Sequence, residues 1–140
     1  MYRRILVAVE NSPADRTILT HVSTLAALTG AELLLVHVAD GFAARHFQDL
    51  NLRESEEIRG DRDYLARIAS ELAARSIVTS TELAMGDPAT ELIRLVRERD
   101  VDLLAMATHG HRGLSDLVHG TTVNRVRHEV KIPILLLRAQ

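Results

Sequence analysis

The fold is indicated near the amino end by the run Ile5-Leu6-Val7-Ala8-Val9 and by the segment after it, Glu10-Asn11-Ser12-Pro13-Ala14-Asp15. An apolar run without strict alternation is typical of a strand buried on both faces of a parallel sheet. The second segment predicts a helix start, with Ser12 as N-cap, Pro13 in the first helical position and Asp15 in the third. We expect this helix to end at Gly30 and to turn inward Ile18, Val22, Leu25 and Ala26.

The same alternation of strand and helix continues along the chain. Apolar runs predict buried strands at Leu33–Ala39, Leu103–Ala107 and Ile134–Leu137, and the Thr-rich run Thr79–Met85 predicts a strand nearer an edge. Helices are expected over Glu54–Arg75, from Asp87-Pro88 and from near Thr121, with inward residues Ile58, Leu65, Ile68, Ala69, Leu72, Leu92, Ile93, Val96, Val123, Val126 and Val130. This order predicts an α/β fold: a parallel sheet with helices on both faces and right-handed crossovers.

Composition limits the classes of protein that are possible. The length of 140 residues predicts a single domain over 1–140, and 46% hydrophobic residues indicate a globular chain. The net charge of −2 and scattered basic residues argue against a nucleic-acid partner. The chain has no cysteine, which excludes disulfides and thiolate catalysis. No apolar segment has the length of a membrane span or the pattern of a signal peptide, so we expect a cytoplasmic protein with no membrane partner.

The most informative candidate site lies in Ala107–Thr122. In an open parallel sheet, ligands bind at the carboxyl ends of the strands, and Val9–Ser12, Val38–Gly41 and Ala107–Gly110 are expected there. The third segment leads to Gly120-Thr121-Thr122, where small residues, helix N–H groups and two hydroxyls suit a phosphate. A glycine-rich turn followed by a Thr-capped helix explains the same residues, and spacing alone does not separate the two interpretations.

Several other kinds of site are not indicated. There is no P-loop motif and no Gly-x-Gly-x-x-Gly after the first strand. A receiver domain would need an acidic cluster at the first turn, where Glu10 stands alone in the sequence. His109, His111, His119 and His128 crowd one stretch, but without Cys or paired carboxylates nearby we interpret them as polar loop residues and predict no metal site. No catalytic residue is predicted either.

The chain resembles the universal stress protein family. Met106-Ala107-Thr108-His109-Gly110, then nine residues, then Gly120-Thr121 is similar to the family's ATP loop. The opening Ile5–Ser12, Leu35-Val36-His37-Val38, Gly86-Asp87-Pro88 and the closing Ile132–Leu136 also match the family in order. The resemblance covers the whole chain.

The resemblance implies a Rossmann-like, adenine nucleotide alpha hydrolase-like fold, with five parallel strands in the order 3-2-1-4-5. It also implies a site for ATP, with or without Mg²⁺. In this site Val9 and Glu10 border the adenosine, and Val38 and Met106 pack near the base. Ala107, Thr108, His109 and Gly110 would form the start of the ATP loop. Gly120, Thr121 and Thr122 would hold the phosphates. Two residues depart from the family pattern: Ala107 replaces the first loop glycine, and Glu10 replaces an aspartate.

Two functions follow from these expectations. The first is an ATP-binding regulatory protein of the stress response, with at most slow hydrolysis; AMP, a cyclic nucleotide or another adenosine compound is an open alternative. The second is a nucleotide-free dimeric interaction module with a vestigial site. In both, the apolar strand Ile134–Leu137 at a sheet edge is expected to form a homodimer. The stretch Asp40–Arg53 is expected to be a lid, a partner loop or a plain surface connection.

Overall fold

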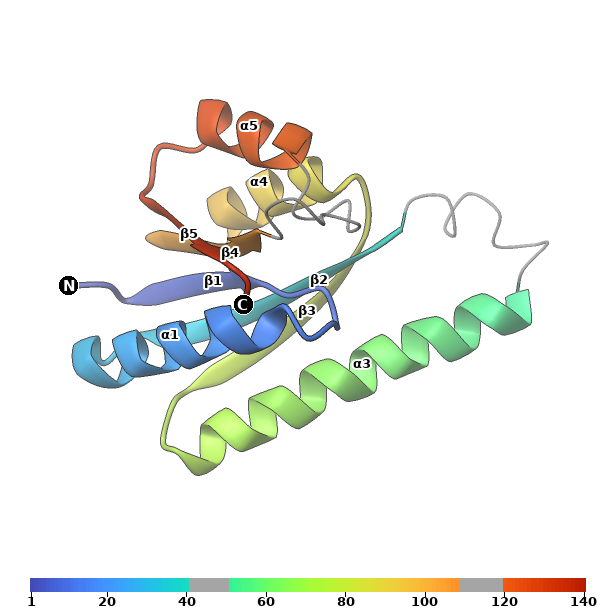
Figure 1. The fold of residues 1–140 in the computed structure, drawn as a ribbon, viewed down its shortest axis with the longest axis horizontal. Coiled ribbons are helices and arrows are strands. Elements are labelled where there is room, and N and C mark those ends of the chain that lie inside the picture. Colours follow the sequence, from blue (N-terminus) through green and yellow to red (C-terminus); the bar gives the residue numbers. More distant parts are fainter. Residues whose placement is uncertain (41–50, 109–119) are drawn as a thin grey trace.

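Strands and helices alternate in the computed structural model, which describes residues 1–40, 51–108 and 120–140 (Figure 1). The strands are β1 (Arg4–Ala8), β2 (Glu32–Asp40), β3 (Thr79–Gly86), β4 (Leu103–Thr108) and β5 (Ile134–Arg138). The helices are α1 (Asp15–Thr29), α3 (Asn51–Ala74), α4 (Pro88–Glu98) and α5 (Gly120–Glu129). The predicted order of elements is confirmed, and each predicted strand differs from the observed one by no more than one residue at either end.

The described strands form one parallel sheet in the order β3-β2-β1-β4-β5. The central strand β1 pairs with β2 through Ala8 opposite Val36, and with β4 through Val7 opposite Ala105. A strand in the middle of a sheet covered on both faces is surrounded by apolar groups, which explains why β1 is a continuous apolar run. The α/β fold and the order 3-2-1-4-5 are thereby confirmed, and β3 lies at an edge of the sheet, as its Thr-rich sequence predicts.

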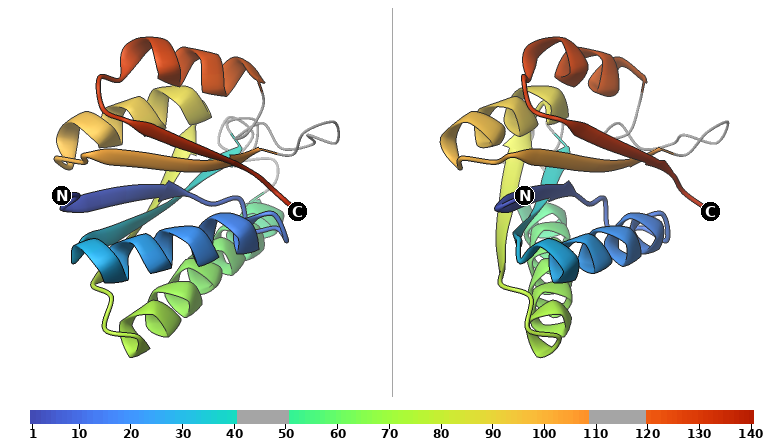
Figure 2. Two further views of the ribbon diagram at one scale, coloured as in Figure 1. Left: turned by 60° about the vertical axis from the view of Figure 1, so that its left-hand side comes forward. Right: turned by 90° about the vertical axis from the view of Figure 1, so that its left-hand side faces the viewer.

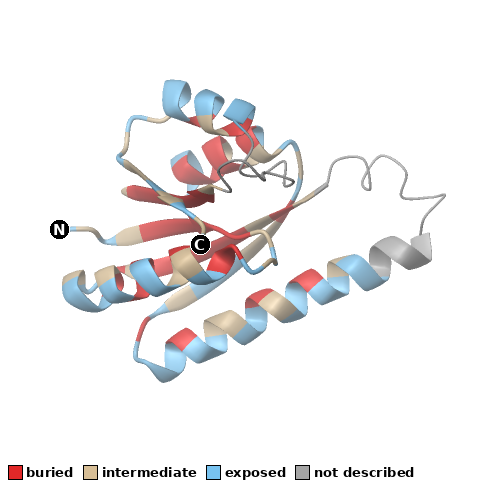
Figure 3. Ribbon diagram, viewed as in Figure 1, coloured by how far each residue is buried: buried red, intermediate tan, exposed pale blue. Residues whose placement is uncertain are grey.

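Helices cover both faces of the sheet, α1 and α3 on one and α4 and α5 on the other (Figures 1 and 2). Successive residues of β1 point to opposite layers: Ile5 and Val7 pack on the α1 side, and Leu6 and Ala8 on the α4 side. Burial is concentrated in the central strands and on the inner faces of the helices (Figure 3). Each Leu or Ile that is fully buried there contributes about 1.5–3 kcal/mol through removal of apolar surface from water.

The inward faces of the helices agree with the expected pattern. Fully or nearly fully buried are Ile18, Val22, Ala26, Leu65, Leu72, Leu92, Ile93, Val96 and Val126. Half-buried are Leu25, Ile58, Ile68, Ala69, Val123 and Val130. The start of α4 also agrees, because Asp87 is its N-cap, accepts a hydrogen bond from the Thr90 N–H at 3.0 Å and is followed by Pro88 in the first turn.

The start of α1 differs from the prediction. The helix begins at Asp15 with Ala14 as N-cap, and the residues from Ser12 form a turn in which the Asp15 N–H donates to the Ser12 carbonyl at 3.1 Å. Ser12 Oγ accepts from the Ala14 N–H at 3.2 Å within this turn. The physical reason is that the Asp15 carboxylate turns back and accepts the N–H groups of Glu10 and Asn11, so the chain closes a turn before the helix begins.

The end of α1 confirms the prediction. Gly30 has φ = 76°, in the left-handed region, and its N–H donates to the Ala26 carbonyl at 2.8 Å. This is the helix termination for which glycine is preferred.

Helix α3 begins earlier than predicted, at Asn51 instead of Glu54, and ends at Ala74. Three residues assigned to the connection Asp40–Arg53 are therefore helical, and Asp40 is the last residue of β2. Acidic residues are favoured in the first turn of a helix, and position 54 of the sequence is acidic, which agrees with a start at Asn51. The remaining part of that connection, residues 41–50, lies outside the described residues, so its expected role as a lid or partner loop stays a prediction.

Strand β5 is less buried than predicted. Ile134–Leu137 was expected among the strands buried on both faces, but its residues are half-buried or exposed, and Leu136 is 39% exposed. The reason is its place at the edge of the sheet, where it pairs with β4 alone among the described strands.

No helix in residues 1–40, 51–108 and 120–140 is long and apolar enough to cross a membrane.

Candidate functional site

The sheet has a switch point between the adjacent strands β1 and β4. The chain leaves β1 into α1 on one face, whereas α5, which follows β4, lies on the other face (Figure 2). At such a point the two connections diverge and leave a crevice at the carboxyl ends of the strands, which is where ligands of open α/β sheets bind. The predicted residues Val9, Glu10, Ala107 and Thr108 lie at the carboxyl ends of these two strands.

The turn after β1 forms one side of the crevice at the carboxyl ends of the strands. The Val9 N–H donates to the Val36 carbonyl at 2.9 Å, which extends the pairing with β2 by one residue. Val9 is buried, Glu10 is half-buried, and Asn11 has φ = 61°, a left-handed conformation that asparagine tolerates better than most residues. The turn therefore presents Glu10 and Asn11 at the edge, where the sequence predicts the adenosine end of a nucleotide.

The carboxylate of Asp15 lies beneath this turn and is 2% exposed. It accepts hydrogen bonds from the N–H groups of Glu10 at 3.0 Å and Asn11 at 2.9 Å, and from the Tyr64 hydroxyl at 2.6 Å. Burial raises the pKa of Asp15, and the hydrogen bond from Tyr64 and those from the turn lower it in part. Burial and the neighbouring Asp15 raise the pKa of the Tyr64 hydroxyl, which therefore stays protonated and remains a donor.

A second buried carboxylate, Asp61 of α3, meets the same turn from the other side. It accepts a hydrogen bond from the Asn11 side-chain amide at 3.1 Å, and its Oδ2 lies 3.2 Å from Nε2 of His37. Nδ1 of His37 lies 3.0 Å from the Val9 carbonyl oxygen. The turn is thus surrounded by polar side chains of α1, α3 and β2.

Asp61, Tyr64 and His37 are not among the residues predicted for this site, and Glu10 is predicted to be the lone acid at this turn. The structure corrects that prediction, because folding brings Asp15 and Asp61 to the turn. A signal was present: Asp61 falls on the inward stripe of α3 with Leu65, and His37 interrupts an apolar strand. A carboxylate and a histidine in two inward positions indicate a buried pair, since a buried charge needs a partner.

The side chains of Val38, Met106 and Ala107 point into the core. They are 7%, 0% and 3% exposed, with Val38 and Met106 in the layer under α4 and Ala107 in the layer under α1. A molecule at this edge would therefore meet their backbone first. The extra methyl of Ala107 is packed in the core, which removes it from the exposed edge. Thr108 is half-buried, and its carbonyl accepts the Ala139 N–H at 2.7 Å.

The first turn of α5 contains the predicted phosphate residues. Gly120 and Thr121 are exposed, whereas Thr122 is 8% exposed and points inward. This turn has no acidic residue, whereas α1 and α4 each have one. Its positive dipole end is therefore not offset by a carboxylate of its own first turn. His109 and Gly110 lie outside the described residues.

Helix α5 is fixed against α4 by Arg125. Its guanidinium donates to Asp87 Oδ2 at 2.6 Å and to Thr90 Oγ1 at 3.2 Å. The hydrogen bonds from Thr90 and Arg125 hold the pKa of Asp87 below its usual range. The contact links the middle of α5 to the start of α4 on this face of the sheet.

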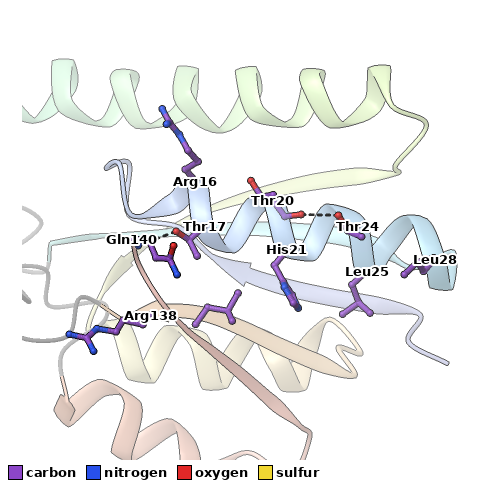
Figure 4. Close-up of a pocket in the computed structure, with 10 residues that line it drawn as sticks. Arg16, Thr17, Thr20, His21, Thr24, Leu25, Leu28, Arg138 and Gln140 are labelled. Carbon is purple, nitrogen blue, oxygen red and sulfur yellow. Dashed lines mark hydrogen bonds between the residues drawn. The ribbon is translucent and has the colours of Figure 1, made fainter.

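A groove of about 810 Å³ lies apart from this edge, between α1 and β5 (Figure 4). Three leucines line it together with polar and charged residues; the full lining is Arg16, Thr17, Thr20, His21, Thr24, Leu25, Leu28, Leu137, Arg138 and Gln140. Leu28 is 80% exposed, so the groove opens to solvent at its α1 side.

Within the described part of the chain, no group of three or more His, Cys, Asp or Glu side chains is arranged to hold a metal ion. Of the four clustered histidines in the sequence, His128 is exposed on α5, and His109, His111 and His119 lie outside the described residues.

The strand order and the helices on both faces define a doubly wound α/β protein with a switch point between β1 and β4. Residues 1–138 match the universal stress protein family, and the chain belongs to this family. The resemblance found in the sequence is thereby confirmed.

Relatives match over nearly the full length. The universal stress protein YxiE of Bacillus subtilis is 25% identical over 99% of this chain and 100% of its own. The solved structure of MJ0577, a universal stress protein of Methanocaldococcus jannaschii, has a TM-score of 0.83 at 22% identity and covers 100% of this chain and 98% of that one.

Two other structures of the same fold were solved with nucleotides. A universal stress protein in complex with cAMP has a TM-score of 0.71 at 17% identity and covers 99% of this chain and 98% of that one. The universal stress protein of Archaeoglobus fulgidus in complex with dAMP has a TM-score of 0.71 at 18% identity, covering 96% and 97%.

Proposed function

We propose that this chain binds an adenine nucleotide, ATP with Mg²⁺ in the first instance, at the edge between β1 and β4. One observation supports this most. The two strands that flank the switch point are β1, which is followed by the turn with Glu10, and β4, after which α5 is the next helix. Related proteins of this fold were solved with cAMP and dAMP, so an adenine nucleotide is the ligand class of choice.

Each predicted residue has a role in this proposal. The backbone of Val9 and the side chain of Glu10 border the adenosine, and the backbone of Val38 and Met106 lies near the base. Ala107 and Thr108, at the carboxyl end of β4, lie next to the proposed ligand position. For His109 and Gly110, outside the described residues, a role at the ligand is proposed from the sequence pattern alone. At α5, Gly120 allows close approach, Thr121 offers an exposed hydroxyl, and the buried Thr122 supports the turn.

The proposed role is regulatory, in a response to stress, with binding as the main event and hydrolysis slow at most. Membership of the family suggests this role. That the protein acts in the cytoplasm stays a prediction from the sequence.

The test is calorimetry on protein freed of nucleotide, with ATP and Mg²⁺, AMP and cAMP as ligands. Gly120→Val is the informative variant, because a Cβ at position 120 meets no atom within 4 Å and φ there is ordinary. The added side chain would occupy space needed by phosphate and weaken binding by at least about tenfold. Gly60→Val is the matched control, since position 60 is equally open and lies in α3.

Micromolar binding by the natural protein and by Gly60→Val, lost in Gly120→Val, is the expected result. It would make Ala107 and Glu10 tolerated departures from the family pattern. No binding of any of the three nucleotides by the natural protein would reject the proposal and leave the nucleotide-free module as the better description.

We also propose that the chain forms a homodimer through β5. The supporting observation is that β5 is an edge strand with Leu136 39% exposed. Leu137, the next residue, lines the groove along α1 (Figure 4). An uncovered apolar edge invites pairing with another strand, and a second copy related by two-fold symmetry would cover both edges at once.

A further inference from the structure

The β1–α1 turn is held in place by residues distant in the sequence. Its Asn11 adopts φ = 61°, a conformation that costs energy for a residue other than glycine and persists only when surrounding contacts support it. Those contacts come from Asp15, which starts α1, and from residues of α3 and β2 that lie 28 to 50 positions from their partners along the chain.

Tyr64 supports the turn through Asp15. Its hydroxyl donates to Asp15 Oδ2 at 2.6 Å, and the same oxygen accepts the Asn11 N–H at 2.9 Å. The hydrogen bond from Tyr64 therefore fixes the carboxylate that in turn fixes two backbone N–H groups. Arg67 lies over the Tyr64 ring, 5.4 Å from its centroid, and limits the ring's movement.

Asp61 supports the turn directly and through His37. It accepts the Asn11 amide at 3.1 Å and lies 3.2 Å from His37 Nε2, while His37 Nδ1 lies 3.0 Å from the Val9 carbonyl. A carbonyl oxygen only accepts, so Nδ1 carries a hydrogen. Nε2 then faces the Asp61 carboxylate.

From this geometry we infer that Tyr64, Asp61 and His37 are positioning residues of the nucleotide site, so that helix α3 sets the shape of the turn that borders the adenosine. The inference rests on the proposed function. Its content goes further: none of the three residues needs to touch the nucleotide, and affinity depends on how α3 is docked. By thermodynamic reciprocity, a bound nucleotide would in turn strengthen the docking of α3.

Tyr64→Phe is the first test, since it removes one hydroxyl and keeps the ring. We expect the dissociation constant for ATP to rise by roughly tenfold, as expected for a site misplaced by a fraction of an ångström. Tyr2→Phe is the matched control, because Tyr2 is half-buried at the opposite end of the sheet. The dissociation constant of the Tyr2→Phe variant for ATP should stay within about twofold of the value for the natural protein. Equal affinities in Tyr64→Phe and Tyr2→Phe would overturn the inference.

Asp61 allows a test by rescue. Asp61→Ala removes the acceptor for Asn11 and the partner of His37, whereas Asp61→Asn keeps an acceptor for Asn11 and offers an N–H to a neutral His37 Nε2. We expect Asp61→Ala to lose affinity by roughly tenfold or more and Asp61→Asn to regain most of it. A role in stability alone would lower the melting temperature of Asp61→Ala with an unchanged dissociation constant in the folded protein, and that result would contradict positioning.

A measurement without ligand separates this inference from the proposed function. Hydrogen exchange of the Glu10 and Asn11 amides, followed by NMR, reports whether their bonds to Asp15 persist. We expect faster exchange at both amides in Tyr64→Phe and Asp61→Ala and unchanged exchange in Tyr2→Phe. If the natural protein binds no nucleotide, the proposed function fails; if exchange at the two amides is the same in all variants, the positioning role fails.

Discussion

Two aspartates near helix starts have opposite titration behaviour. Asp87 is exposed, and the hydrogen bonds from Thr90 and Arg125 lower its pKa. Asp15 is buried beneath the β1 turn, and burial raises its pKa despite its donors. A lowered pKa means that Asp87 stabilises the fold above the ordinary aspartate pKa of 3.8 and loses this effect as the pH falls. For Asp15 the sign is reversed: its titration favours the fold at low pH, and this benefit is lost as the pH rises.

The contribution of Asp87 can be isolated with Asp87→Asn, which keeps a capping side chain and removes the charge. At pH 7 the variant should be less stable by about 0.5 kcal/mol, a value kept small because the site is exposed. This difference should shrink as the pH falls below 3.8 and the natural carboxylate is protonated. Urea unfolding at pH 7, 5 and 3 measures it; a difference that is the same at all three values would contradict the assigned role of the charge.

At the scale of the elements, two glycines in open surroundings have opposite conformational demands. Neither Gly30 nor Gly60 would place an added Cβ within 4 Å of another group. Gly30 ends α1 with φ = 76°, whereas Gly60 lies inside α3. Packing is therefore not a factor, and backbone conformation alone decides what an alanine does at each position.

We expect Gly30→Ala to destabilise the protein by about 1 kcal/mol, because alanine is strained in the left-handed region. Gly60→Ala should stabilise it by up to about 1 kcal/mol, because alanine is the better helix former. Chemical denaturation of both variants beside the natural protein checks the prediction. The same sign for both substitutions would show that the end of α1 is not held in the left-handed form.

The elements were largely predictable from the sequence because their signals are local. Apolar runs mark the strands, and Gly30 and Asp87-Pro88 mark helix ends, all of which are confirmed. The errors arise where distant groups decide. Asp15 closes a turn before α1 because Tyr64 of α3 completes its hydrogen bonds, and β5 is half-exposed because it pairs with one described neighbour. Neither partner is visible from the local pattern.

For the whole molecule, the edge strand β5 leads to a prediction about assembly. Leu136→Lys places a charge on the exposed part of β5 and should weaken a dimer through this edge, shifting the protein to monomer at micromolar concentration. Val78→Lys is the control, since Val78 is also exposed, at 68%, and precedes the opposite edge strand. Light scattering coupled to size-exclusion chromatography measures the mass; a natural protein that is monomeric throughout would reject the dimer.

The candidate site was predictable in part at this scale. The sequence places Val9, Glu10 and Ala107 at the carboxyl ends of the correct strands, and the order β3-β2-β1-β4-β5 brings these ends to the switch point. It does not reveal that Asp61, Tyr64 and His37 meet under the β1 turn, because the contacts join α3 to that turn, to α1 and to β2 across 24 to 50 residues. Their positions carry a signal, but only the packing of α3 on the sheet identifies the partners.

The parallel sheet also decides how the protein can be handled. Since β1 starts at the amino ends of the parallel strands and β5 finishes at their carboxyl ends, the two ends of the chain lie toward opposite ends of the strands (Figure 2). The Gln140 N–H donates to Thr17 Oγ1 at 3.2 Å beside the groove, so a tag or surface linker attached there would crowd both the groove and the carboxyl edge. Met1 is 98% exposed, and tethering through it leaves both surfaces facing the solution.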